Sequence, residues 1–262
     1  MSEASADFFS QRQHYQLMRS KLQSRQLLVL MDFTSAFLTP KIGHQSNNSV
    51  VQDCIVVLEY LSSSGERVRE NIDFLCDCAD TNKNDYHFVL TVWLHLFLFK
   101  KFADRFDYID VWTDGGPHHF KTRYCQWMWH WLSVKKFHNR RISHHFFASY
   151  HGHSLADAHA ASIKRTIRTE YNMSQLQRLN TTTLSIYWGP ADANHLSFLL
   201  KKCCKTDIIV FSHIDRDPLL KPDPMPLVHI KRQHCFDYED GKCYASELSS
   251  GALKKLFSFC LR

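Results

Sequence analysis

Residues 27–33 read LLVLMDF, an unbroken apolar run that closes on an aspartate and a phenylalanine. The run is too short for a typical helix and is typical of a central strand that is buried on both faces. An acidic side chain inside such a run is costly to bury unless it is paired or binds a metal ion. The sequence therefore predicts a buried first strand with Asp32 as a candidate functional residue, the alternative being a strand-end acid that faces solvent.

Strand and helix patterns alternate on the C-terminal side of this run. A β-rich stretch, an SSSGE turn and a returning stretch predict a hairpin of two edge strands, and helices and strands then follow in turn. The predicted order is strands at 27–33, 50–61 and 68–76, a helix at 85–102, a strand at 108–113, a helix at 119–132, a strand at 142–150 and a helix at 154–168. This order predicts an α/β fold with a mixed five-stranded sheet flanked by helices.

Additional elements are expected at both ends of the chain. A polar helix with one apolar stripe is predicted at 8–26, and a polar LNTTT loop is predicted beyond Tyr171. The remaining patterns predict a helix near 193–203, a strand at 207–212 and a hairpin at 227–244 that turns at Asp240-Gly241. We therefore divide the chain into a lead-in helix (1–26), a catalytic-type core (27–171) and a C-terminal α/β extension packed on the core (172–262).

The composition favours a globular intracellular protein with a polyanionic partner. A chain of 262 residues with 44% hydrophobic residues can bury a sizeable core, and its net charge of +6 suits a polyanionic partner. Its nine cysteines are an odd number, and no basic, then apolar, leader opens the chain, so a reducing intracellular compartment is expected. The most apolar segment, 89–99, is interrupted by His95 and is too short to cross a bilayer, so no membrane partner is expected.

Two further aspartates complete a candidate metal site. Asp114 ends the strand at 108–113 in the sequence TDGG, and Asp157 lies in the first turn of the helix after the next strand. If strand 108–113 lies beside strand 27–33, Asp32 and Asp114 become neighbours. Oxygen ligands suit hard divalent cations, and two such ions can promote phosphoryl displacement. The alternatives are structural: Asp114 can start a turn, and Asp157 can belong to a capping box with Ser154.

Three segments, LVLMDFTSAF, VWTDGGPHHFKTRY and FFASYHGHSLADAHAASIKRTIR, carry a family resemblance. In order and with compatible spacing they resemble the blocks DFSENY, SDGxxxQFKNR and FFATSHGKxxCDGxGGxxKR of a dispersed group of transposon-derived eukaryotic proteins. The resemblance covers roughly residues 8–168. It implies a ribonuclease-H-like, DDE-type transposase core.

The resemblance assigns roles to individual positions. It implies that Asp32, Asp114 and Asp157 are the catalytic metal ligands for Mg²⁺ or Mn²⁺. It also singles out residues beside the second and third acids: Lys121, Arg123, His151, Gly152, Lys164 and Arg165. The chain departs from the blocks at Thr122, at His153 and in the alanines around Asp157. These departures bear on substrate contacts and on activity.

Basic residues and histidines surround the candidate site in the sequence. Those expected to contact nucleic acid are Lys121, Arg123, Lys135, Lys136, Arg140, Arg141, Lys164, Arg165 and Arg168. A solvated helix face is the alternative for these clusters. Among the seventeen histidines, His151 is the candidate for proton transfer, and the others are expected to be structural or exposed.

These features predict a Mg²⁺- or Mn²⁺-dependent polynucleotidyl transferase or endonuclease that acts on DNA, as a DDE-type transposase or its domesticated descendant. Double-stranded DNA is the expected partner, a homo-oligomer is compatible with the pattern, and the nucleus is the expected compartment. One alternative is a catalytically silent nucleic-acid-binding or scaffold protein on the same fold. Another is a junction-resolving nuclease or exonuclease, because a fold alone does not determine function.

Overall fold

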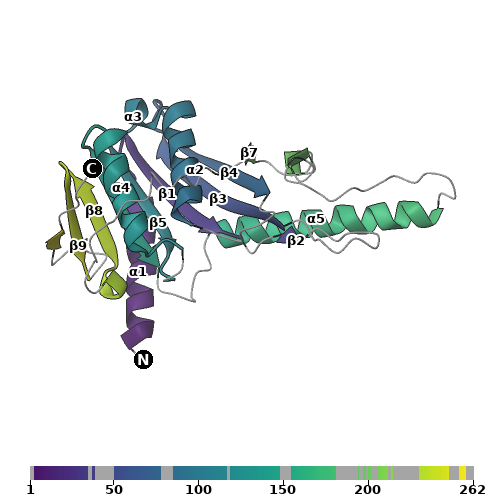
Figure 1. Ribbon diagram of the computed structural model, residues 1–262, viewed down its shortest axis with the longest axis horizontal. Coiled ribbons are helices and arrows are strands. Elements are labelled where there is room, and N and C mark those ends of the chain that lie inside the picture. The colour runs from purple at the N-terminus through teal and green to yellow at the C-terminus, as the bar shows by residue number, and fades with distance from the viewer. Residues whose placement is uncertain are drawn as a thin grey trace.

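The computed structural model describes residues 3–34, 37–38, 50–77, 85–116, 119–147, 155–180, 194, 197–198, 200–201, 206–211, 214, 230–247 and 254–257. Within them, a mixed β-sheet runs through the molecule and helices cover both of its faces (Figure 1). The predicted α/β class with a mixed, helix-flanked sheet is therefore confirmed.

Strand β1 (Gln26–Phe33) lies in the middle of the sheet, as its apolar run predicts. It pairs antiparallel with β3 (Val50–Leu61) and parallel with β5 (Tyr108–Asp114). Its side chains alternate between two cores, because successive residues of a strand point to opposite faces. Leu27, Val29 and Met31 pack with α2 and α4 on one face, whereas Leu28 and Leu30 pack with α1 and α5 on the other.

The strands follow the order β10-β9-β8-β6-β5-β1-β3-β4-β7, and β2 pairs with β3 off this path. The bounds of the remaining strands are β2 (Phe37–Leu38), β4 (Arg67–Asp77), β6 (Arg141–Phe147), β7 (Asp207–Phe211), β8 (Cys235–Glu239), β9 (Lys242–Ser246) and β10 (Lys254–Phe257). Strands β1, β5 and β6 are parallel, and the predicted β3–β4 hairpin is antiparallel.

The sheet is wider than the five strands predicted, because the C-terminal extension adds strands to both sides. Strand β7 pairs with β4, and β8 pairs with β6, so the β3–β4 hairpin is not at an edge. The β8–β9 hairpin begins at Cys235, later than predicted, but it turns at Asp240-Gly241 as expected. Both turn residues have positive φ (50° and 70°), as an Asp-Gly hairpin turn requires.

The helices are α1 (Glu3–Ser20), α2 (Tyr86–Phe99), α3 (Phe102–Arg105), α4 (Arg123–Lys135) and α5 (Leu155–Asn180), with a 3₁₀ turn η2 (Ile230–Arg232). The sequence offers Asn84 or Asp85 as the cap of α2, and it is Asp85 that accepts a hydrogen bond from the Phe88 N–H. Helix α1 begins and ends earlier than expected, and α4 starts later, after Thr122 as its cap.

Helix α5 is longer than the predicted 154–168 and continues to Asn180, so it includes the first two residues of the predicted LNTTT loop, and the other three lie outside the described residues. The helix extends well past the sheet (Figure 1). The predicted helix near 193–203 falls largely outside the described residues. In the described part of the chain, no helix has the length and apolar character needed to span a membrane.

Candidate active site

Two of the predicted aspartates end neighbouring parallel strands. Met31 of β1 is paired with Thr113 of β5, so the next residues, Asp32 and Asp114, lie side by side. Asp32 shares a strand face with Leu28 and Leu30, and Asp114 shares one with Trp112; these three apolar residues belong to the core beneath α1 and α5. The sheet therefore brings the two carboxylates together on the α5 face.

Helix α5 supplies the third predicted carboxylate. Ala156 and Ile163 are buried against the sheet, which places Asp157, in the first turn, beside the end of β1. Burial, together with the charges of Asp157 and Asp114, raises the pKa of Asp32 to about 7, although a hydrogen bond from the Phe33 N–H opposes this rise. The structure thus places both Asp157 and Asp114 within electrostatic reach of Asp32.

The three carboxylates share this end of the sheet without closing around one point. Among the described residues, no group of three or more His, Cys, Asp and Glu side chains is arranged to hold a metal ion. Asp32 and Asp114 are the best-placed pair of oxygen donors, because adjacent strands fix them both. His151 and His153 lie outside the described residues.

A buried lysine lies beside the second acid. Lys121 is only 7% exposed, and its Nζ lies 5.0 Å from the centroid of the Phe146 ring. Burial lowers the pKa of Lys121 to about 8, although the charge of Asp114 raises it. Lys121, expected as a nucleic-acid contact, is therefore a largely enclosed positive charge next to Asp114.

The glycines after Asp114 leave room for its carboxylate and for the end of β6. A methyl group on Gly115 would collide with the main-chain carbonyl oxygen of Phe147, and one on Gly116 would lie 2.6 Å from Asp114 Oδ2. Gly115 is needed for this close approach of two backbones. Gly116 is needed so that the carboxylate of Asp114 keeps its position.

We expect Gly115→Ala to lower the free energy of unfolding by about 1–3 kcal/mol, because the added methyl group must displace the backbone of β5 or β6. Urea unfolding followed by circular dichroism measures the change. Gly116→Ala is the matched control, because its clash is with a side chain that can rotate. A Gly115→Ala variant with the parent's unfolding midpoint would contradict the described packing.

Four of the predicted nucleic-acid contacts lie at the other end of the sheet. Arg141 is paired with Tyr108 at the start of β5, and Asp114 is paired with Phe147 at the end of β6. Six strand residues therefore separate Arg141 from the site, about 20 Å at 3.3 Å per residue. The residues grouped there are Lys135, Lys136, Arg140 and Arg141. This position separates them from the carboxylates that they were expected to flank.

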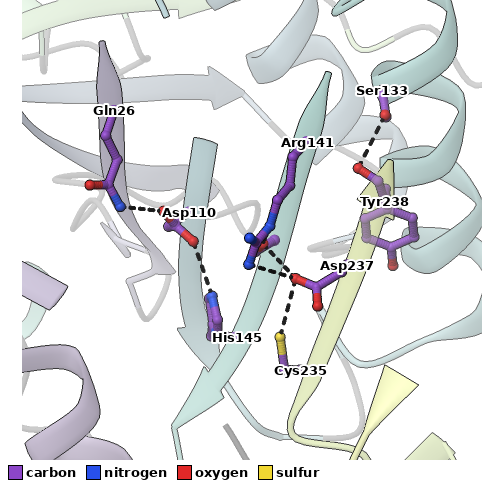
Figure 2. Close-up of polar contacts among 9 residues, drawn as sticks. Gln26, Asp110, Ser133, Arg141, His145, Cys235, Asp237 and Tyr238 are labelled. Carbon is purple, nitrogen blue, oxygen red and sulfur yellow. Dashed lines mark hydrogen bonds and ion pairs between the residues drawn. The ribbon is translucent and has the colours of Figure 1, made fainter. Parts of the chain in front are cut away.

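Two of these four residues also have intramolecular roles. Arg140 donates hydrogen bonds to the carbonyl oxygens of Ala103 and Phe106. Arg141 pairs with Asp237 of β8 across the strand pair that joins the core to the extension (Figure 2). Both arginines therefore hold parts of the fold together.

The remaining predicted nucleic-acid contacts are nearer in sequence to Asp114 or Asp157 than these four residues are. Arg123 begins α4 and lies against the ring of Tyr124, with its guanidinium carbon 4.9 Å from the ring centroid. Lys164 and Arg165 are exposed on α5. The side chain of Arg168 lies outside the described residues.

Residues 11–202 match the model of a family described as a domain of unknown function, DUF8701. The chain belongs to this family. The matched region begins within α1, contains all of α5, and includes Asp32, Asp114 and Asp157. No curated protein and no solved structure matches the chain.

The DUF8701 region contains further buried polar residues that the sequence analysis did not identify. Asp110 accepts hydrogen bonds from Gln26 Nε2 (2.6 Å) and contacts His145 Nε2 (3.3 Å), forming a polar row across β1, β5 and β6 (Figure 2). Asp53 and Asp73, on β3 and β4, are both 0% exposed. An acidic residue within an apolar strand is the sequence pattern that could have indicated these buried acids, but it was applied only to Asp32.

Proposed function

We propose that this protein is a ribonuclease-H-like nuclease or DDE-type polynucleotidyl transferase that cleaves or joins DNA phosphodiester bonds with Mg²⁺ or Mn²⁺. The observation that carries the proposal is the adjacent placement of Asp32 and Asp114, at the ends of parallel strands, with Asp157 on the helix that follows β6. The proposal is also supported by the position of β1, which lies between its antiparallel partner β3 and its parallel partner β5.

The chemistry of the three side chains fits a hard divalent cation. Like charges gather on one face, and the pKa of Asp32, raised to about 7 by burial and by its acidic neighbours, reflects the cost. A cation would favour the ionised carboxylates, and carboxylate oxygens are ligands that Mg²⁺ and Mn²⁺ accept. A bound metal would act as a Lewis acid on a phosphoryl oxygen and lower the pKa of a bound water.

The protein's own residues would position and balance this charge. The Phe33 N–H donates a 2.8 Å hydrogen bond to Asp32 Oδ1 and so orients that carboxylate. Gly116 leaves space for Asp114, and Lys121 provides a positive charge beside it. Asp157 approaches from the first turn of α5.

The exposed basic residues of α5 provide phosphate contacts for a DNA backbone in this proposal. Lys164 follows Asp157 by seven residues, which is two helical turns or about 10 Å along the axis, on nearly the same side. Both Lys164 and Arg165 are exposed, and the chain carries a net charge of +6. Contacts of this kind bind phosphates without reading base sequence.

Cleavage of end-labelled DNA with Mn²⁺ tests the proposal. We expect Asp114→Asn to reduce the rate about a thousandfold or more, because the loss of a metal ligand removes several kcal/mol of transition-state stabilisation. Asp104→Asn, an exposed acid on α3, is the control and should cleave like the parent. Equal rates for the parent and Asp114→Asn would refute the metal role. A parent that binds DNA and never cleaves it would favour the silent nucleic-acid-binding protein.

A further inference from the structure

Helix α5 is held to the sheet by a buried polar contact close to Asp157. His159 Nε2 lies 2.9 and 3.1 Å from the two carboxylate oxygens of Asp73 on β4. The side chain of Asp73 is 0% exposed and that of His159 is 12% exposed, so water competes little for the bond. The contact requires only a proton on Nε2, which neutral histidine can carry.

The geometry of a helix connects this contact to Asp157. Ala156 and Ile163 form the stripe that faces the sheet. At 3.6 residues per turn, Asp157 and His159 are about 200° apart around the axis and lie on opposite flanks of that stripe. The hydrogen bond between His159 and Asp73 therefore fixes the rotation of α5 about its axis, and this rotation determines the direction in which Asp157 points. The apolar stripe alone fixes the rotation poorly, because hydrophobic contact is non-directional.

The C-terminal extension also takes part in this contact. Thr206, immediately before β7, donates its hydroxyl proton to Asp73 Oδ2, and the same hydroxyl oxygen lies 3.0 Å from the Asn71 carbonyl oxygen. Strand β7 in turn pairs with β4. Asp73 is thus oriented from one side by the extension while it holds α5 on the other.

We propose that Asp73 and His159 are positioning residues that fix the rotation of α5 and thereby direct Asp157 toward Asp32. The inference deepens the proposed function, since it assigns to this contact the placement of the third metal ligand. Neither residue touches the reacting atoms. Residues that orient metal ligands from outside the coordination shell affect metal affinity about 10- to 100-fold.

The first test needs no metal. Cysteines are introduced by Asp32→Cys and Asp157→Cys in the full chain, and the yield of a short thiol-to-thiol cross-link between positions 32 and 157 is measured by mass spectrometry. Adding His159→Ala should lower the yield several-fold. Adding His159→Gln, which retains an N–H donor, should restore it. Ile163→Ala is the matched control, because it weakens the packing of α5 and leaves the directional bond in place.

All variants are compared at temperatures that give equal folded fractions by circular dichroism. The positioning role would be overturned if His159→Ala gave the same cross-link yield as the protein without that change. It would also be overturned if Ile163→Ala lowered the yield as much as His159→Ala does.

The second test measures Mn²⁺ affinity by calorimetry in chains that retain all three aspartates. His159→Ala should weaken binding about 10-fold or more, while Ile163→Ala should bind like the parent. Equal affinity in His159→Ala and the parent would overturn the inference. A parent that binds no Mn²⁺ would refute the proposed function, and the cross-linking yields would still decide whether the contact orients α5.

Discussion

At pH 8 the Asp32→Asn variant is expected to unfold with a free energy up to about 4 kcal/mol higher than that of the parent. Burial, with the charges of Asp157 and Asp114, raises the pKa of Asp32 from 3.8 to about 7. A displacement of that size corresponds to about 4 kcal/mol between the protonation states. Asparagine has nearly the same shape, can accept the Phe33 N–H hydrogen bond and carries no charge.

The pH dependence of this effect has a definite sign. A carboxyl group whose pKa is raised by folding binds its proton more tightly in the folded state, so stability falls as pH rises. The loss of stability caused by ionisation of Asp32 begins near pH 4 and is complete slightly above pH 7. Burial and the charge of Asp73 also raise the pKa of Asp53. Asp53 therefore also makes the free energy of unfolding fall as the pH rises, both in the parent and in Asp32→Asn. The difference between parent and variant is therefore the quantity to measure.

Urea unfolding at pH 4 to 8 provides that difference. We expect the two proteins to be similarly stable near pH 4 and to diverge as the pH rises. Asp104→Asn, exposed on α3, should follow the parent throughout. Parallel curves for the parent and Asp32→Asn would mean that Asp32 is not the strained carboxylate described above.

The second large effect is expected at the contact between α1 and the sheet. Arg19 donates two hydrogen bonds to Glu59 of β3, at 2.6 and 2.9 Å, and Arg69 adds another at 2.9 Å. The side chain of Glu59 is 2% exposed. We expect Arg19→Ala to lower the free energy of unfolding by about 3 kcal/mol, the low end for breaking a buried ion pair, because Arg69 remains.

Thermal and urea unfolding measure this loss, with Arg12→Ala, an exposed cation on the same helix, as the control. Burial raises the pKa of Glu59, but hydrogen bonds from Arg19 and Arg69 outweigh it and leave the pKa below the usual 4.5. The stabilisation from Glu59 is therefore present above pH 4.5 and is lost as the pH falls below it. An Arg19→Ala protein as stable as Arg12→Ala at pH 7 would show that the pair contributes little.

Glu59 and Asp32 lie on the same side of the sheet, yet the pKa of one is lowered and that of the other is raised. Arginines neutralise Glu59, which is what a structural role requires. Asp32 is buried and lies near Asp157 and Asp114, and this arrangement lowers stability unless a cation binds. Perturbed carboxylates of this second kind concentrate at functional sites.

Local patterns in the sequence predicted the central elements well. The apolar run of β1, the turn between β3 and β4, and the Asp85 cap of α2 each depend on nearby residues, and each was found. Asp32 and Asp114 were expected to be neighbours if β5 lies beside β1, and the structure meets that condition. These features were accessible because period, capping and turn chemistry are local properties.

Long-range pairing was not predictable in the same way. Nothing local to β4 or β6 shows that β7 and β8 pair with them, so the width of the sheet was underestimated. The distance of Arg141 from the site follows from the register of β5 and β6, and the burial of Lys121 accompanies its contact with the Phe146 ring of β6. The contact of Asp73 with His159 joins residues 86 positions apart, and no local pattern links them.

The central claim is that Asp32, Asp114 and Asp157 form one site for a divalent cation. The most direct test is the pKa of the Asp32 carboxyl group, followed by carbon-13 NMR with and without millimolar Mg²⁺. We expect a pKa of about 7 without metal and, in the parent but not in Asp114→Asn, a value lower by at least about one unit with metal. An Asp32 pKa that is already near 4 without metal, or that Mg²⁺ leaves unchanged, would contradict the account.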